Sequence, residues 1–196
     1  KEVLTSEMIE HQKYFPLIKK NNNKNGDLTN IFVITANQPK TPQIIAGNIR
    51  VLTARLSDGR FLYQEDIKKG MDEMNGRLSI LMFRKELGSV ADKVKRLEKN
   101  AASLIEALNY NENKDNILKA IKYMKADLVS NMVYQFPELQ GIMGSYFAKE
   151  MGLGENIATA IKEQYKPLFA NDDIPSNDTG KAIAILDKII INQNVI

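Results

Sequence analysis

The run KYMKADLVSNMVYQFPELQGIMGSYFA, residues 122–148, decides the fold of this chain. Its apolar residues recur at helical spacing on both sides of a turn at Phe136-Pro137, and one acidic residue, Asp127, lies near the middle of the first part. Gly141 and Gly144 permit close backbone approach. The pattern therefore predicts two helices that are joined by a short connection and pack on each other.

Helical patterns flank this run and predict a mostly helical domain over residues 76–196. Gly88 ends one element, and Ser89 is a suitable N-cap for the helix after it. The apolar face of that helix is expected to consist of Val90, Val94, Leu97, Ala101, Leu104 and Leu108. Two later helices are expected around residues 157–165 and 183–190.

Residues 1–75 predict a small α+β segment that forms part of a larger domain. Two β-like runs, 14–18 and 31–35, flank a polar connector at 19–27, which is typical of a β-hairpin with a long, mobile loop. An isolated hairpin is marginally stable, so we expect a partner sheet or helix from elsewhere in the parent protein. A helix follows from Gln43, and Gly59 either interrupts it or permits a close contact.

Composition restricts the possible functions. The 196 residues carry a formal charge of +3, which is too mild to establish nucleic-acid binding, although one basic face remains possible. The absence of cysteine excludes disulfides, zinc–thiolate sites and a thiol nucleophile. No apolar run approaches the roughly 20 residues of a membrane span, and the first residues are too polar for a signal peptide. We therefore expect a cytoplasmic protein without a membrane partner. A chain that begins at Lys1 without methionine is expected to be a piece of a longer one.

Six phrases follow one another along the chain: HQKYFPL at 11–17, AGNIRVLTARLSDGRFLYQEDIKK at 46–69, FRKELGSVADKVKRLEK at 83–99, KADLVSNMVYQFPELQGIMGSYFA at 125–148, YKPLFANDDIPS at 165–176 and AIAILDKI at 182–189. In this order they resemble the β subunit of the bacterial heterotetrameric glycyl-tRNA synthetase, and FPELQGIMG is the most specific of their motifs. That subunit is several times longer, so the resemblance implies a middle portion. After AILDKI, residues 190–193 depart from the acidic, turn-forming continuation typical of the family.

The resemblance implies a part in charging the glycine tRNA. The α subunit makes glycyl-adenylate from glycine and ATP, with Mg²⁺, and transfers glycine to the tRNA, releasing AMP and diphosphate. The β subunit supplies tRNA recognition, so the implied partners are the α subunit and the glycine tRNA, with no cofactor in this portion. The implied fold is mainly α, with a domain similar to the HD phosphohydrolases after the small α+β segment.

HD enzymes hold a metal with a His, a His-Asp pair and a later Asp, which are suitable ligands for acidifying a bound water. In this chain Ala126-Asp127 corresponds to the pair and Asp187 to the last Asp, while no histidine occurs near residues 89–92. The one histidine, His11, lies outside this domain. We therefore expect a degenerate HD domain without catalytic or metal-binding residues. Asp127 and Asp187 are interpreted as structural carboxylates that cap a helix or pair with a lysine; the alternative is a degenerate metal or RNA-facing position.

The candidate RNA-binding residues are Lys13, Arg50, Arg55, Lys93, Lys95, Arg96 and Lys99. Lysine and arginine side chains contact RNA phosphates, and the last four form the densest basic cluster in the sequence. A solvated helix face is the competing interpretation of that cluster. Arg50, Arg55 and Arg60 recur every five residues, so they spread around their helix rather than lining one face. Two other functions remain open: a residual metal-dependent phosphohydrolase, in which Asp127 and Asp187 bind Mg²⁺ weakly, and a module that only docks onto the α subunit.

Overall fold

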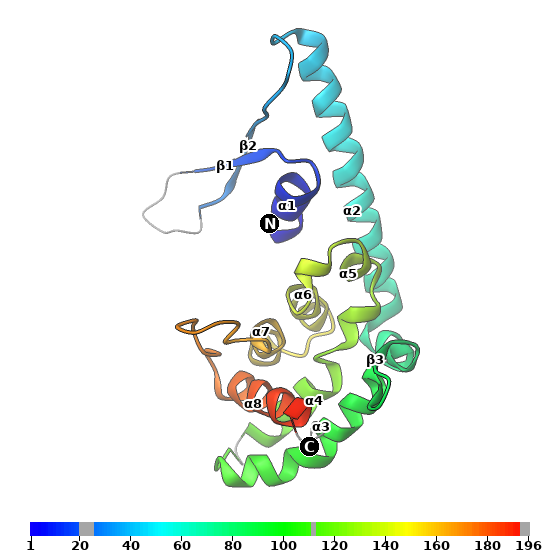
Figure 1. The fold of residues 1–196 in the computed structure, drawn as a ribbon, viewed down its shortest axis with the longest axis vertical. Coiled ribbons are helices and arrows are strands. Elements are labelled where there is room, and N and C mark those ends of the chain that lie inside the picture. Colours follow the sequence, from blue (N-terminus) through cyan, green and yellow to red (C-terminus); the bar gives the residue numbers. More distant parts are fainter. Residues whose placement is uncertain (20–25, 111–112, 193–196) are drawn as a thin grey trace. The chain divides into compact units, whose positions relative to one another are not determined.

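The computed structural model describes residues 1–19, 26–110 and 113–192. The chain divides into two compact units, Lys1–Gln64 and Glu65–Ile196. Helices dominate the described residues, and strands are confined to two short hairpins, so the expected mainly α fold with a small β part is confirmed (Figure 1). The expected domain boundary after residue 75 stays a prediction.

The first unit contains the predicted hairpin. Strands β1 (Phe15–Ile18) and β2 (Leu28–Val33) pair antiparallel, with a register shift after Pro16 (Figure 1). The long connector was predicted to be mobile, but its residues 20–25 lie outside the described part. Ahead of the hairpin come α1 (Glu2–Ser6) and the π-helical η1 (Glu7–His11).

Helix α2 (Pro42–Arg77) begins in the first unit and continues into the second. It passes through Gly59 without a break, and a Cβ atom at that position would lie at an ordinary van der Waals distance of 3.9 Å from Val3, so neither an interruption nor a contact that requires glycine is found there. The break comes at Gly70, whose φ of 72° and ψ of 162° are not helical. Because glycine adopts positive φ readily, the chain can change direction there.

After α2, the second unit continues with η2 (Leu78–Ile80). The short strands β3 (Met82–Arg84) and β4 (Gly88–Ser89) follow and pair antiparallel. Ser89 then caps α3 (Val90–Ala107) in a reciprocal capping box with Asp92, which confirms the predicted helix start. The buried apolar residues of α3 are Val90, Val94, Leu97, Ala101 and Ile105. Leu104 and Leu108, which were expected on this face, are half-buried.

The stretch 122–148 is not the predicted pair of continuous helices. Helix α4 (Lys114–Tyr123) ends at the second residue of this stretch. It is followed by four short elements: η4 (Ala126–Val129), α5 (Asn131–Gln135), η5 (Pro137–Leu139) and α6 (Ile142–Glu150). The reason is local. Ser130 has an extended backbone and its hydroxyl accepts from the Val133 N–H, which starts a new helix inside the predicted one.

The carboxylate of Asp66, on α2, also accepts hydrogen bonds from the N–H groups of Asn131 and Met132 at 3.0 and 2.8 Å. Asp66 is fully buried, so this contact satisfies two N–H groups at the start of α5 that no helical carbonyl can reach. A carboxylate 65 positions away in the sequence therefore helps to set where α5 begins.

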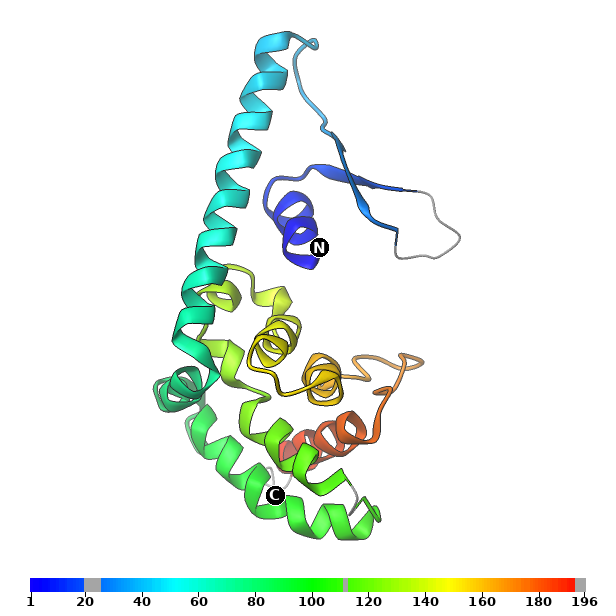
Figure 2. The ribbon, with the colours of Figure 1, turned by 180° about the vertical axis from the view of Figure 1, so that it is seen from behind.

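The core of the second unit lies around α7 (Glu155–Glu163), which packs against α4, α6 and α8 (Asp178–Asn192). Helix α8 also packs against α3 and α4, and Figure 2 shows these helices from behind. Their buried apolar side chains are mainly Ala and Ile, including Ile121, Ala160 and Ile183. Among the described residues, no helix is both long and apolar enough to cross a membrane.

Candidate functional site

Four charged side chains and Tyr165 lie together in the interior of the second unit. We call these five residues the buried charge cluster. Lys93 comes from α3, Lys125 from the turn after α4, Asp127 from η4 and Asp187 from α8. The four are 0–6% exposed. Removing a charge from water is costly unless a partner compensates for the lost hydration, so each of these groups needs a partner.

Asp187 joins the two lysines. Its Oδ1 lies 2.6 Å from the Lys93 ammonium group, and its Oδ2 lies 3.3 Å from that of Lys125. Burial acts to raise the pKa of Asp187, but the Lys125 and Lys93 charges outweigh it and hold the pKa below its usual value. The carboxylate is therefore ionised at neutral pH and bridges α3, α8 and the turn after α4.

Aromatic rings cover both ammonium groups. The Lys93 Nζ lies 4.8 Å from the centre of the Phe83 ring, and the Lys125 Nζ lies 4.2 Å from that of Tyr165. Burial lowers the pKa of Lys125 to about 8, although Asp187 acts in the opposite direction. Burial also raises the pKa of the Tyr165 hydroxyl, as do Asp127 and Asp187, so this phenol stays protonated.

Asp127 caps a helix. Its Oδ2 accepts hydrogen bonds from the Gly141 N–H at 2.6 Å and the Gly144 N–H at 3.0 Å, at the start of α6. A Cβ atom on Gly144 would lie 3.1 Å from that oxygen and 2.8 Å from Ile161, so the glycine permits this close approach. These contacts agree with the interpretation of Asp127 as a capping carboxylate.

The acidic residues of the cluster are poor candidates for a metal site. Asp187 faces two ammonium groups, and the bonded oxygen of Asp127 faces two backbone donors. Within the described part of the chain, no three His, Cys, Asp or Glu side chains are grouped closely enough to hold a metal ion. A cation placed here would meet Lys93 and Lys125 at close range, so the donor set does not fit a hydrolytic metal.

The predicted basic cluster on α3 divides between the interior and the surface. Both interpretations of the cluster, RNA contact and a solvated face, require exposed side chains, and neither fits Lys93, which is 4% exposed and paired with Asp187. Lys95 and Lys99 are exposed as expected. Arg96 donates from Nη1 to the Leu87 carbonyl at 2.9 Å, and its other two guanidinium nitrogens are buried without a partner among the described residues.

Sequence reasoning missed Lys125 altogether and misplaced Lys93, yet a signal existed for both. Lys93 directly precedes Val94 on the apolar stripe of α3, and Lys125 stands between the buried residues Met124 and Ala126. Two lysines on apolar faces, together with Asp187 on a third, indicate internal ion pairing. The other RNA candidates, Lys13, Arg50 and Arg55, are exposed in the first unit.

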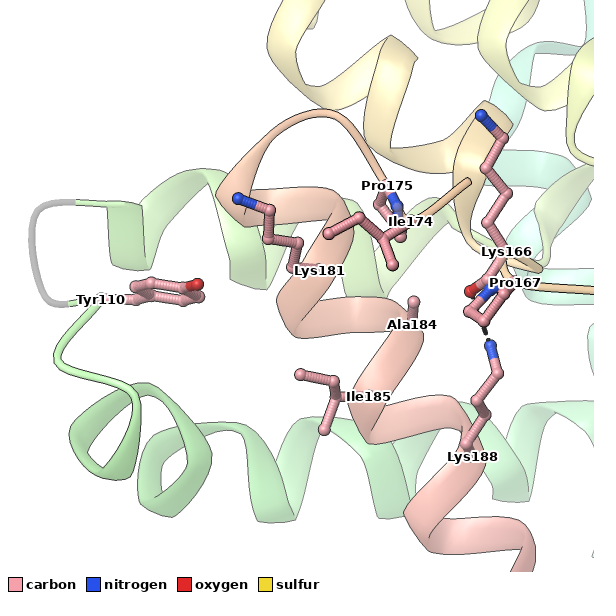
Figure 3. A pocket seen from close by; sticks show the side chains of 9 residues that line it. All are labelled: Tyr110, Lys166, Pro167, Ile174, Pro175, Lys181, Ala184, Ile185 and Lys188. Atoms are coloured by element: carbon pink, nitrogen blue, oxygen red, sulfur yellow. Dashed lines mark hydrogen bonds between the residues drawn. The ribbon is translucent and has the colours of Figure 1, made fainter. Parts of the chain in front are cut away.

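An apolar cavity of about 230 Å³ lies beside α8, and its lining includes none of the cluster residues (Figure 3). Tyr110, Ile174, Pro175, Ala184 and Ile185 contribute to its lining. Three lysines also line it, each of them tied to a neighbour: Lys166 to Glu163 at 3.0 Å, Lys181 to Asp178 at 2.9 Å, and Lys188 to the Lys166 carbonyl at 2.7 Å. The cavity is therefore an apolar hollow with a polar rim, which is typical of a contact surface for another protein segment.

Asp127 makes the stability of this region depend on pH. Burial raises its pKa to about 6, against the opposing hydrogen bonds from Gly141 and Gly144, while the unfolded value is 3.8. The folded state therefore holds more protons between those values, and its stability, full below about pH 4, should fall by about 3 kcal/mol as pH rises past 6. Native-state hydrogen exchange of the α6 amides in the full-length protein, followed from pH 4 to 7, measures this loss. The variant Asp127→Asn should remove the slope; an unchanged slope in this variant would assign the titration to another group.

Comparison with known proteins places the chain in a family. A family model described as "Glycyl-tRNA synthetase beta subunit" matches residues 1–191. Proteins named "Glycine--tRNA ligase beta subunit" are similar to it: one from Listeria monocytogenes serotype 4b (strain CLIP80459) is 42% identical over 191 residues, and one from Bacillus subtilis (strain 168) is 41% identical over 191 residues. Each alignment covers 96% of this chain but only 27% and 28% of the relative. With the motifs at 11–17, 83–99 and 125–148 all inside the matched region, the chain belongs to the glycyl-tRNA synthetase β-subunit family and spans about a quarter of the length of these relatives.

Proposed function

We propose that residues 1–196 form a non-catalytic part of a glycine–tRNA ligase, helping to place the glycine tRNA while the α subunit performs the chemistry. Membership of the β-subunit family carries this proposal. In the complete enzyme, the α subunit would use ATP, Mg²⁺ and glycine to form the adenylate and then glycyl-tRNA. The buried charge cluster supplies neither a nucleophile nor a metal site, which favours a structural role for it.

We further propose that the second unit is an HD-like domain retained as a scaffold. Asp127 and Asp187 stand where an HD enzyme has metal ligands, but here they cap α6 and neutralise two lysines. Lys93 and Lys125 would then provide the positive charge that a metal provides in an active relative. A fixed cation suffices to neutralise Asp187, whereas hydrolysis would require a site that activates water.

The exposed residues Lys95 and Lys99 on α3 are proposed as tRNA phosphate contacts. The double variant Lys95→Glu/Lys99→Glu should weaken tRNA binding by the αβ enzyme and reduce the slope of log K against log salt by roughly 1 for each lost contact. Lys119→Glu, a matched charge reversal at an exposed position on α4, is the control. Arg96 is left unchanged because its guanidinium group bonds the Leu87 carbonyl.

A salt titration of tRNA binding, with glycylation measured in parallel, tests this assignment. An unchanged slope in the double variant would remove this face of α3 from the tRNA site.

A second candidate function, docking onto the α subunit, is favoured by exposed apolar side chains near the cavity beside α8: Leu168 is 72%, Phe169 68% and Ile174 64% exposed. Co-purification of α with a β subunit carrying Phe169→Asp and Ile174→Asp distinguishes the two, since only docking requires these side chains.

A further inference from the structure

The two strands of the first unit differ in how their outer edges are protected. Strand β1 contains Pro16, which has no N–H to donate, and its register shifts directly after that residue. Proline and local irregularity are features of strands that stay at the edge of a sheet. Strand β2, with the sequence LTNIFV, has neither proline nor a charged residue. An uncharged edge of this kind is a template for pairing with another strand.

Part of the β2 backbone is also hydrogen-bonded to a side chain of the same strand. The N–H of Ile31 donates to the Thr29 hydroxyl at 3.2 Å, and that hydroxyl donates to the Ile31 carbonyl at 3.1 Å. The register pairs Phe32 with Pro16 and Leu28 with Ile18, so Thr29 and Ile31 lie within the irregular part of the ladder. A side-chain hydroxyl thus serves backbone groups that a neighbouring strand would serve in a regular sheet. Both bonds are exposed, so a strand could replace them at little cost.

Apolar side chains around β2 are largely uncovered. Phe15 and Val33 lie opposite each other in the register and share a face of the hairpin, where they are 54% and 48% exposed. Ile31 is 58% exposed. An apolar cavity of about 240 Å³ lies beside the same strand, with Ile31, Ile45 and Ile49 in its lining.

The first unit buries little of its own apolar surface. Among its described residues, the buried apolar side chains are Met8 and Leu52. A two-stranded hairpin is marginal in water and needs either further strands or a packed face. If β2 is an interior strand of a larger sheet, this explains its exposed apolar face and its unprotected edge. It also explains why the first unit has so small a core.

We propose that a further β-strand of the same subunit, from outside residues 1–196, pairs with the free edge of β2 and covers its apolar surroundings. The same polypeptide is the preferred source because these residues span only 27% of a relative's length, and a tethered strand has a high effective concentration. The edge recognises an uncharged strand rich in β-branched or aromatic residues, since Ile31 and Val33 would be its neighbours. This inference does not depend on the tRNA-binding role.

Photo-crosslinking in the full-length β subunit tests the pairing. With p-benzoylphenylalanine in place of Ile31, irradiation of β without α should link position 31 to a peptide of the same subunit outside residues 1–196. The same photoreactive residue in place of Leu118, an exposed position on α4, is the control and should give a different peptide. Linkage of position 31 to residues within 1–196, or to nothing, would overturn the proposal.

Hydrogen exchange supplies a second readout that the photoreactive side chain cannot disturb. In full-length β, the amides of β2 should exchange about 100-fold or more slowly than unpaired amides. Thr29→Ala should leave this protection within about threefold, because the neighbouring strand and not the hydroxyl then holds the Ile31 backbone. Ile31→Pro, which removes the N–H, should lower protection about tenfold or more, whereas Ile31→Ala should retain it. Loss of protection in Thr29→Ala would show that the local bonds are the only ones and would overturn the proposal.

Discussion

Replacing Asp187 with alanine should destabilise the second unit by about 3–5 kcal/mol, because it leaves two ammonium groups buried without their shared counter-charge. Lys93 and Lys125 lie 2.6 and 3.3 Å from this carboxylate and are 4% and 3% exposed, so water cannot easily compensate for its loss. The loss should appear as faster native-state hydrogen exchange in α3 and α8 of the full-length β subunit, since these helices are joined through the Lys93 pair.

Two comparisons separate charge burial from a general intolerance of substitution in α8. Asp178→Ala removes a carboxylate from the same helix, but its pair with Lys181 is only half-buried and should contribute less than the Asp187 pairs. The triple variant Lys93→Met/Lys125→Met/Asp187→Leu removes all three charges together and should recover much of the lost stability. Failure of the triple variant to improve on Asp187→Ala would show that packing, rather than unpaired charge, dominates the effect.

Asp127→Ala is expected to cost about 2–4 kcal/mol, because the N–H groups of Gly141 and Gly144 would both lose their buried acceptor. Helix α6 should fray from its first turn, which hydrogen exchange of the peptide covering residues 141–150 would detect. The loss relative to the native protein should be larger at pH 5 than at pH 7, since protonation of Asp127 stabilises the native protein below about pH 6 and the alanine variant lacks this group.

Asp127→Asn is the matched control for this cap. The amide keeps an oxygen that can accept from both glycines and removes a carboxyl whose pKa burial has raised to about 6. It should therefore match or exceed the native stability at pH 7, while Asp127→Ala falls below it. Equal losses in the two variants would contradict the capping role and point to a requirement for the negative charge itself.

Elements that depend on residues close together in the sequence could be predicted. Ser89 and Asp92 form a capping box within four residues, and the β1–β2 hairpin follows from two β-like runs around a polar connector. The ends of the strands shifted by up to three residues, since β2 begins at Leu28 and ends at Val33. Such boundaries depend on pairing partners as well as on local preference.

The interpretation of residues 122–148 failed for a physical reason. Helical spacing of apolar residues cannot distinguish one continuous helix from short helical pieces whose side chains meet the same core. Asp66 and Asp127 satisfy the free N–H groups at the starts of α5 and α6 from outside those helices. Such long-range caps let a chain break where periodicity alone predicts continuity.

The sequence by itself determined the mainly α class and the family, because each follows from residue identity and order. Only the tertiary structure decided what the carboxylates of Asp127 and Asp187 bind. Asp127 and Asp187 are 60 positions apart, and their partners come from three further segments: Lys93 from α3, Lys125 from the turn after α4, and Gly141 and Gly144 from the start of α6. Whether a buried carboxylate binds a metal, caps a helix or neutralises a lysine depends on which groups folding brings within about 3 Å of it, and spacing along the chain does not encode that distance.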